Sequence, residues 1–109
     1  MDKTVEIEIN GQIKKLKFTY NAVADVEEKV GLGISALFTG EKVGFNTMRH
    51  LLWGGLKWQD RTITVPGAGA MIEKYIENGG RLDDLMLKIF EALDKSGVFA
   101  GNATAEAVE

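Results

Sequence analysis

Hydrophobic and polar residues alternate near the start of the chain. The alternating residues are Val5, Glu6, Ile7, Glu8 and Ile9. A period of two residues is typical of a strand that is buried on one face. The Asn-Gly pair at 10–11 is typical of a two-residue hairpin turn. We therefore expect an antiparallel hairpin whose second strand runs from residue 12 to about residue 18.

A two-residue turn fixes the register of this hairpin. The expected pairs are Ile9 with Gln12, Ile7 with Lys14, Val5 with Leu16, Glu6 with Lys15 and Thr4 with Lys17. This register gathers apolar residues on one face, and only Ile13 and Lys14 are misplaced. Because an isolated hairpin is marginal in water, helices must cover its apolar face.

After the hairpin, apolar residues recur every three or four positions, which is the period of an amphipathic helix. Thr19 or Asn21 can cap the first helix, and Gly31 can end it. Asp25 and Lys29 are spaced for an ion pair on that helix. The expected helices span residues 20–30, 46–57, 64–78 and 82–96, with one further helical turn near 34–38 and a loop at 39–45.

Two of these helices carry unusual residues. Asn46 or Thr47 can cap the second helix, and Thr64 can cap the third, where Pro66 is tolerated in the first turn. The glycines at 54–55 each cost about 1 kcal/mol relative to alanine in a helix interior. Residues this small allow another backbone to approach closely.

The change of period predicts an α+β fold that is mostly α, with an N-terminal β-hairpin packed on a bundle of about four helices. Residues 1–99 are expected to form a single globular domain. Residues 100–109 are mostly small, with two glutamates and little bulky apolar surface to offset the entropy of ordering. We expect these residues to be a flexible C-terminal tail.

Composition narrows the classes of function. The 109 residues include 45% apolar residues and no cysteine, which excludes disulfides, thiolate metal sites and cysteine nucleophiles. A net charge of -3 argues against binding to nucleic acid or to an anionic membrane through charge alone. The sequence contains no signal-peptide pattern and no run of 18 apolar residues, so we expect an intracellular protein without a membrane partner.

Candidate catalytic residues are few. His50 is the single histidine, and Ser35 and Ser96 are the two serines, so we expect neither a catalytic triad nor a metal site. His50 is expected on the polar flank of its helix. The adjacent carboxylates at 27–28 and 83–84 diverge by about 100° on a helix, so they should form a solvated face or act through the charge at a helix end. No catalytic residue, metal ligand or cofactor is predicted, and the chain is not expected to be an enzyme.

Two glycine clusters partly match phosphate-binding loops. Residues 31–36 fit the pattern G-x-G-x-x-A, but a helix rather than a strand precedes them. Residues 63–70 place Gly67 and Gly69 at a helix start, where backbone N–H groups could bind an anion. Neither a βαβ unit nor a Walker lysine accompanies them. A nucleotide-binding protein is therefore the less favoured alternative.

Two tryptophans and two methionines are candidate partner-binding residues. Trp53 and Trp58 are five residues apart, which places them about 140° apart around a helix. We expect one in the core and the other as an anchor for a partner. Methionine side chains adapt to irregular surfaces. The candidates are Met48, Trp53, Trp58 and Met71.

Several segments together resemble a known family. Residues 16–31 read LKFTYNAVADVEEKVG, residues 48–57 read MRHLLWGGLK, and a helix capped by Thr64 follows with Met71 and Ile72. The chain resembles the tail assembly chaperones of long-tailed bacteriophages, prophages and gene transfer agents over roughly residues 5–80. Residues 66–69, Pro-Gly-Ala-Gly, depart from the acidic residues expected after the threonine cap.

The resemblance implies a role in tail assembly without catalysis. A member of this family binds the long helical tape measure protein, protects its apolar surface, and leaves as tube subunits assemble. Many members also have a longer, frameshifted form whose extension recruits the tail tube protein. The resemblance implies the host bacterial cytoplasm as location and absence from the mature virion. Multivalency favours self-association of several copies along one client.

A small helical nucleic-acid-binding regulator is the main alternative. It would use residues 46–57 and 64–78 as paired helices. Glu73 and Glu77 lie on the second of these helices, where a basic reading face is expected. We therefore expect no nucleic acid partner.

Overall fold

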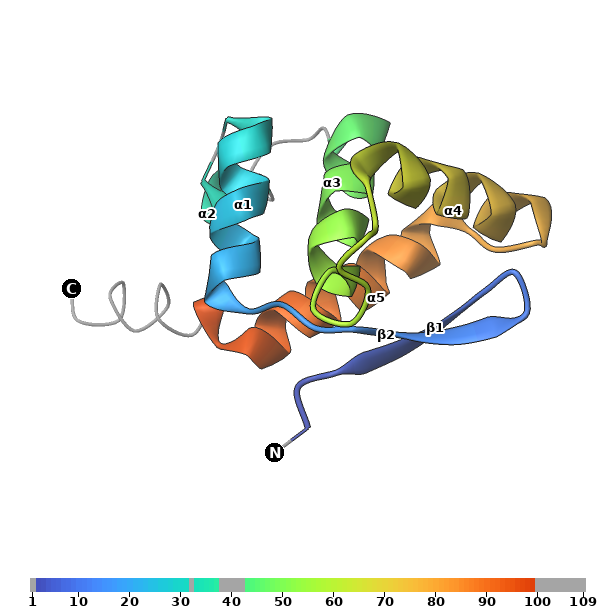
Figure 1. Cartoon of the computed structure of the whole chain (residues 1–109), viewed down its shortest axis with the longest axis horizontal. Helices are drawn as coiled ribbons and strands as arrows, with labels where there is room; N and C mark the ends of the chain where they lie inside the picture. The colour runs from blue at the N-terminus through green and yellow to red at the C-terminus, as the bar shows by residue number, and fades with distance from the viewer. Residues whose placement is uncertain (1, 32, 38–42, 100–109) are drawn as a thin grey trace.

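The computed structural model describes residues 2–31, 33–37 and 43–99. Its elements are β1 (Val5–Ile9), β2 (Gln12–Leu16), α1 (Tyr20–Val30), α2 (Ile34–Leu37), α3 (Phe45–Leu56), α4 (Val65–Glu77) and α5 (Leu82–Ser96). Figure 1 shows a two-stranded hairpin along one side of four longer helices, with α2 a single turn. The predicted α+β, mostly α fold is confirmed. The predicted tail at 100–109 and positions 39–42 of the predicted loop lie outside the described residues.

The hairpin has the predicted register over its whole length. Val5 pairs with Leu16 and Ile9 with Gln12, around a turn in which Asn10 and Gly11 have φ of 54° and 79°. These left-handed conformations suit asparagine and glycine. The apolar residues expected on the core face are buried, and Ile13 is 61% exposed as its misplaced position implied.

The second strand is shorter than predicted. It ends at Leu16 instead of continuing to about Phe18. The backbone N–H of Lys17 donates to the carbonyl of Gly55 on α3 at 2.9 Å, so the chain leaves the hairpin and crosses the helix. The expected pairing of Thr4 with Lys17 is therefore wrong.

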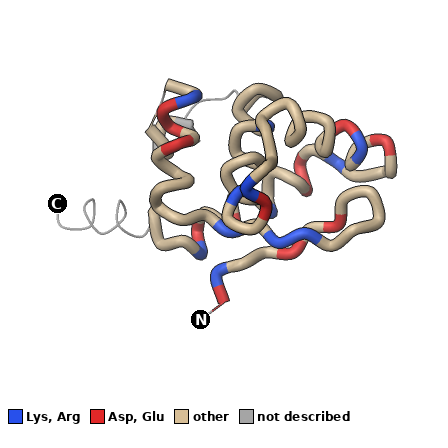
Figure 2. Tube along the Cα trace, in the orientation of Figure 1, with Lys and Arg blue, Asp and Glu red and all other residues tan. Residues whose placement is uncertain are grey.

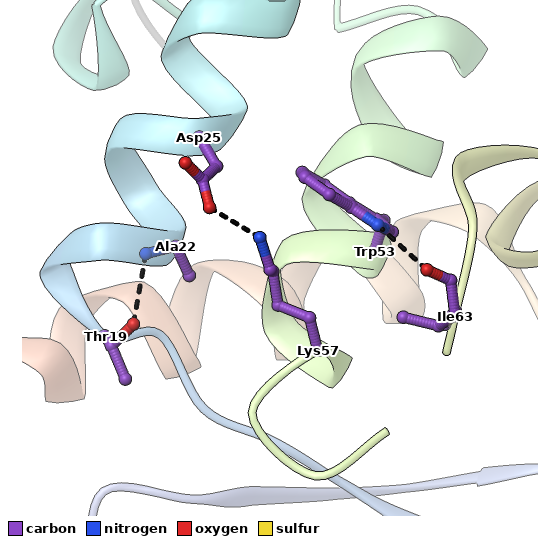
Figure 3. Close-up of polar contacts among 6 residues, drawn as sticks. All are labelled: Thr19, Ala22, Asp25, Trp53, Lys57 and Ile63. Atoms are coloured by element: carbon purple, nitrogen blue, oxygen red, sulfur yellow. Dashed lines mark hydrogen bonds and ion pairs between the residues drawn. The ribbon is translucent and has the colours of Figure 1, made fainter. Parts of the chain in front are cut away.

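Helix α1 has the predicted ends but a different ion pair. The Thr19 hydroxyl accepts the N–H of Ala22 at 3.0 Å, and Gly31 ends the helix with φ of 85°. Asp25 pairs with Lys57, the residue that follows α3, and not with Lys29 (Figure 3). The Lys29 ammonium lies 5.5 Å from the centroid of the Trp53 ring. A tertiary contact has therefore replaced the local pair that spacing alone predicted.

Helix α3 is the central helix of the fold. It contacts α1 on one side and α4 on the other, and it also touches α5 and β2 (Figure 1). It begins at Phe45 after an N-cap at Gly44, so the predicted caps at Asn46 and Thr47 are wrong. Every residue from His50 to Leu56 is buried. A helix buried around most of its circumference belongs to the core.

The glycine pair of α3 lies where α1 and the hairpin come closest. A Cβ atom on Gly54 would lie 2.5 Å from Val26 Cγ2, and one on Gly55 would lie 3.1 Å from Leu16 Cδ2 and from the Phe18 ring. The predicted close approach is confirmed. A side chain at position 54 would overlap Val26, and one at position 55 would require Leu16 and Phe18 to shift by a few tenths of an ångström.

The last two helices complete the core. The Thr64 hydroxyl accepts the N–H of Gly67 at 3.0 Å, which confirms the predicted cap of α4. Helix α5 has the predicted bounds and ends at Gly97 with φ of 89°. Its fully buried residues are Leu85, Ile89, Ala92 and Leu93. One hydrophobic cluster includes buried residues from every strand and helix of the described chain.

We predict that Gly54→Ala lowers the free energy of unfolding by about 1–3 kcal/mol, the usual cost of overpacking a core. The loss should occur even though alanine favours helix by about 1 kcal/mol. Urea denaturation with an unchanged slope would measure it.

Gly69→Ala is the matched control, because its nearest neighbour would be Arg49 Cδ at an ordinary 3.6 Å. This variant should be as stable as the wild type or more stable. Equal stability of Gly54→Ala and the wild type would contradict the packing argument.

Candidate functional site

Two of the four predicted partner-binding residues lie in the core. Met48 is 4% exposed and Trp53 is 9% exposed. The indole N–H of Trp53 donates to the carbonyl of Ile63 at 3.2 Å, and the Lys57 ammonium lies 4.2 Å from its ring centroid (Figure 3). In this conformation neither Met48 nor Trp53 presents a surface to a partner.

Trp58 is half-buried and lies beyond the end of α3 at Leu56. The predicted angle between the two tryptophans therefore does not apply. Its indole N–H donates to the carbonyl of Lys15 at 3.0 Å. The ring borders a cleft of about 410 Å³ together with Thr19, Asn21, Ala22, Asp25, Lys57 and Arg61. Its hydrogen bond shows that Trp58 holds the segment after α3 against the hairpin.

Met71 is half-buried and borders a different hollow of about 80 Å³. That hollow is lined by Lys14, Leu56, Gln59, Asp60 and Met71. The four predicted residues therefore do not share one surface. Their binding role stays a prediction for Trp58 and Met71, which keep exposed area.

A more apolar groove lies between α3 and α4, and we call it the α3–α4 groove. It has a volume of about 250 Å³ and is lined by Phe45, Arg49, Gly69, Ile72, Glu73 and Ile76. Phe45 and Arg49 are one turn apart on α3. The four residues of α4 follow the i, i+3, i+4, i+7 spacing of one helix face. Two helix faces therefore form its walls.

The floor and rim of the α3–α4 groove differ in exposure. Ile72 is 3% exposed and forms the floor, whereas Phe45 is 62% exposed and Ile76 is 40% exposed. Gly69 has no side chain, so the stem of Arg49 lies over it. Large apolar side chains that stand open beside a buried floor are typical of an interaction surface.

Each wall of the groove carries one charge. Arg49 on α3 donates through Nε to the Asn46 side chain at 3.1 Å, which leaves the rest of its guanidinium available. Glu73 on α4 is exposed, and no cation of the described chain lies within ion-pair distance of it. Figure 2 shows acidic and basic positions interspersed along the molecule. A charged partner could therefore meet a cation on one wall and an anion on the other.

His50, the single histidine, was predicted to be neither catalytic nor a metal ligand. His50 is 8% exposed, so the prediction of a polar flank is wrong. Its Nδ1 donates to the carbonyl of Asn46 at 2.7 Å, one turn earlier on the same helix, which accounts for its burial. Within the described ranges, no group of three or more His, Cys, Asp or Glu residues could hold a metal ion.

In both glycine clusters, a side-chain oxygen accepts a backbone N–H at the start of a helix. The Thr64 hydroxyl satisfies the N–H of Gly67 at the start of α4. In the first cluster, the Glu27 carboxylate accepts the N–H of Ile34 at 2.6 Å and so caps α2. Glu27 therefore has a structural partner, whereas the prediction had it solvated.

Comparison with protein families, curated proteins and solved structures finds no match to this chain. None of the described helices combines the length and the apolar character needed to cross a membrane. A functional proposal for this chain therefore depends on the geometry of the site and on the sequence resemblance.

Sequence reasoning missed the α3–α4 groove. The predicted loop at 39–45 included Phe45, and the prediction assigned no surface role to Ile76, so the groove was not expected. The spacing of Gly69, Ile72, Glu73 and Ile76 was a usable signal for one face of α4. It could not show that α3 stops short of covering this face.

We predict that Phe45→Ser and Ile76→Ser each change the free energy of unfolding by about 1 kcal/mol, because Phe45 is 62% exposed and Ile76 is 40% exposed. Ile72→Ala in the floor should cost about 2–4 kcal/mol. Urea denaturation of the three variants would test this. Similar losses for rim and floor would mean that the rim belongs to the core.

Proposed function

We propose that this chain is a non-enzymatic tail assembly chaperone of a phage or prophage that binds the helical tape measure protein. The observation that carries the proposal is the α3–α4 groove, with Phe45 and Ile76 exposed above a buried apolar floor. Grooves of this kind accept the apolar face of an amphipathic helix.

The form of the groove favours a helical client. Its walls are two helix faces, and the side-chain ridge of a third helix can pack between them. The charges of Arg49 and Glu73 on opposite walls would favour a client helix with opposite charges beside its apolar stripe. Such complementarity would set the direction in which the client lies.

The sequence resemblance supports the same role. The segments that carry it form α1, with its cap and Gly31, and most of α3. They include Arg49 of the groove wall, and Gly54 of the same helix packs against Val26 of α1. The resemblance and the groove thus involve neighbouring parts of the molecule.

A small groove suits a chaperone that must release its client. A volume of about 250 Å³ accommodates only a few side chains of a client. Several copies bound along one long client would hold it together by multivalency, while each copy could leave separately. This would allow tube subunits to replace the chaperones one at a time.

We predict that co-expression with this protein increases the soluble amount of a tape measure fragment several-fold. Ile76→Lys should abolish the increase, because a charge in the rim would be buried by the client. The soluble fraction after centrifugation is the measurement.

Leu87→Lys on α5 is the matched control, because Leu87 is 66% exposed and lies outside the groove. It should protect the fragment as well as the wild type does. The proposal fails if the fragment is equally soluble without the protein, or if both lysine variants behave alike. A gene position between those of a tail tube protein and a very long helical protein would support the same role.

A further inference from the structure

The edges of the hairpin carry backbone groups that point away from the partner strand. Ile9 and Gln12 flank the two-residue turn and exchange backbone hydrogen bonds, and every second pair along the ladder does the same. The outward N–H and C=O groups therefore belong to Glu6 and Glu8 on β1 and to Ile13 and Lys15 on β2.

The edge of β2 is covered. The Trp58 indole donates to the outward carbonyl of Lys15 at 3.0 Å, and the N–H of Lys17 donates to Gly55 at 2.9 Å. The Lys17 ammonium also lies 5.2 Å from the Trp58 ring centroid. A strand added at this edge would have to displace Trp58, so the edge is protected against pairing.

Among the described residues, bridges to the β1 side of the hairpin are found near its two ends. The Lys95 ammonium donates to the carbonyl of Thr4 at 3.1 Å, and the Asn78 side chain donates to Asn10 at 3.4 Å. A hollow of about 860 Å³ borders the strand. Its lining includes Glu6, Glu8, Tyr75, Gly80 and Lys88. In the part of the chain that the structure describes, no group outside the hairpin pairs with the outward amides of Glu6 and Glu8.

The two walls of this hollow differ in chemistry. The β1 wall carries two exposed carboxylates, Glu6 and Glu8. The helix wall carries the Lys88 ammonium and the Tyr75 phenol. Burial, and to a smaller extent the Asp84 carboxylate, raises the pKa of Tyr75, so its hydroxyl stays protonated and can donate. The space between the walls favours cations beside β1 and hydrogen-bond acceptors beside the helices.

We propose that the β1 edge binds an extended segment of another protein with Lys or Arg at alternate positions. The segment would add a third strand to the hairpin, with its backbone paired to the amides of Glu6 and Glu8. Basic side chains opposite these glutamates would lie on the same solvent face and form cross-strand pairs. About five residues span β1 at about 3.4 Å per residue.

A second copy of this chain is a poor occupant of the β1 edge. Antiparallel pairing of two β1 strands would place Glu6 and Glu8 of both copies beside one another, and like charges across a strand pair are destabilising. Pairing with the β2 edge of a second copy would require Trp58 to leave Lys15. The charges therefore select a basic partner.

The test uses the peptide acetyl-Val-Thr-Lys-Thr-Lys-Thr-Val-amide and the full chain. One control peptide has Glu in place of both Lys, and a second is N-methylated at both Lys. NMR titration should show perturbed amides at Glu6 and Glu8, with a Kd at least tenfold lower for the Lys peptide than for either control. The charge reversal E6K/E8K should weaken binding about tenfold, whereas Glu28→Lys on the exposed surface of α1 should not.

Glu8→Pro removes an outward N–H without breaking the β1–β2 ladder and should also weaken binding. The proposal is overturned if the Lys and Glu peptides bind equally, or if N-methylation leaves the Kd unchanged, since charge alone would then account for binding. It is also overturned if the free protein dimerises through perturbed Glu6 and Glu8 amides, because a second copy would then fill the edge.

Discussion

The rest of the structure depends on the close contact between the end of α3 and the chain that leaves the hairpin. Gly54 and Gly55 leave room for Val26 and Phe18, and the Gly55 carbonyl accepts the N–H of Lys17. This one crossing attaches α1, α3 and the hairpin to each other. Because protein interiors are packed as densely as organic crystals, it tolerates no added atoms without movement elsewhere.

The same contact decides which residues a partner can reach. The second half of α3 lies in the core, as does Met48 nearer its start, whereas Phe45 and Arg49 stay open beside α4. The α3–α4 groove therefore begins where the burial of α3 ends. The exposed side chains at its rim cost the fold little, so they are free to serve binding.

The polar groups of Lys57 and Trp58, the two residues that follow α3, hold this part of the chain against other elements. Trp58 covers the β2 edge through Lys15, while Lys57 reaches back to Asp25 and lies over Trp53. The ion pair is half-exposed and contributes little by itself. It joins α1 to the residue that follows α3, while Trp58 and the N–H of Lys17 cover the β2 edge and leave β1 as the more open edge of the hairpin.

Local sequence rules determined the hairpin register, the caps at Thr19 and Thr64 and the bounds of α1 and α5, because each depends on residues within a few positions. The small size of the glycine pair predicted a close approach, but the residues that approach come from other elements. The partners of Asp25, the burial of His50, the end of β2 and the surface formed by Phe45 and Ile76 were decided by tertiary structure. Each of these depends on which residues of another element lie alongside. Periodicity identifies the apolar face of a helix, but only the packed neighbour determines how much of that face is covered.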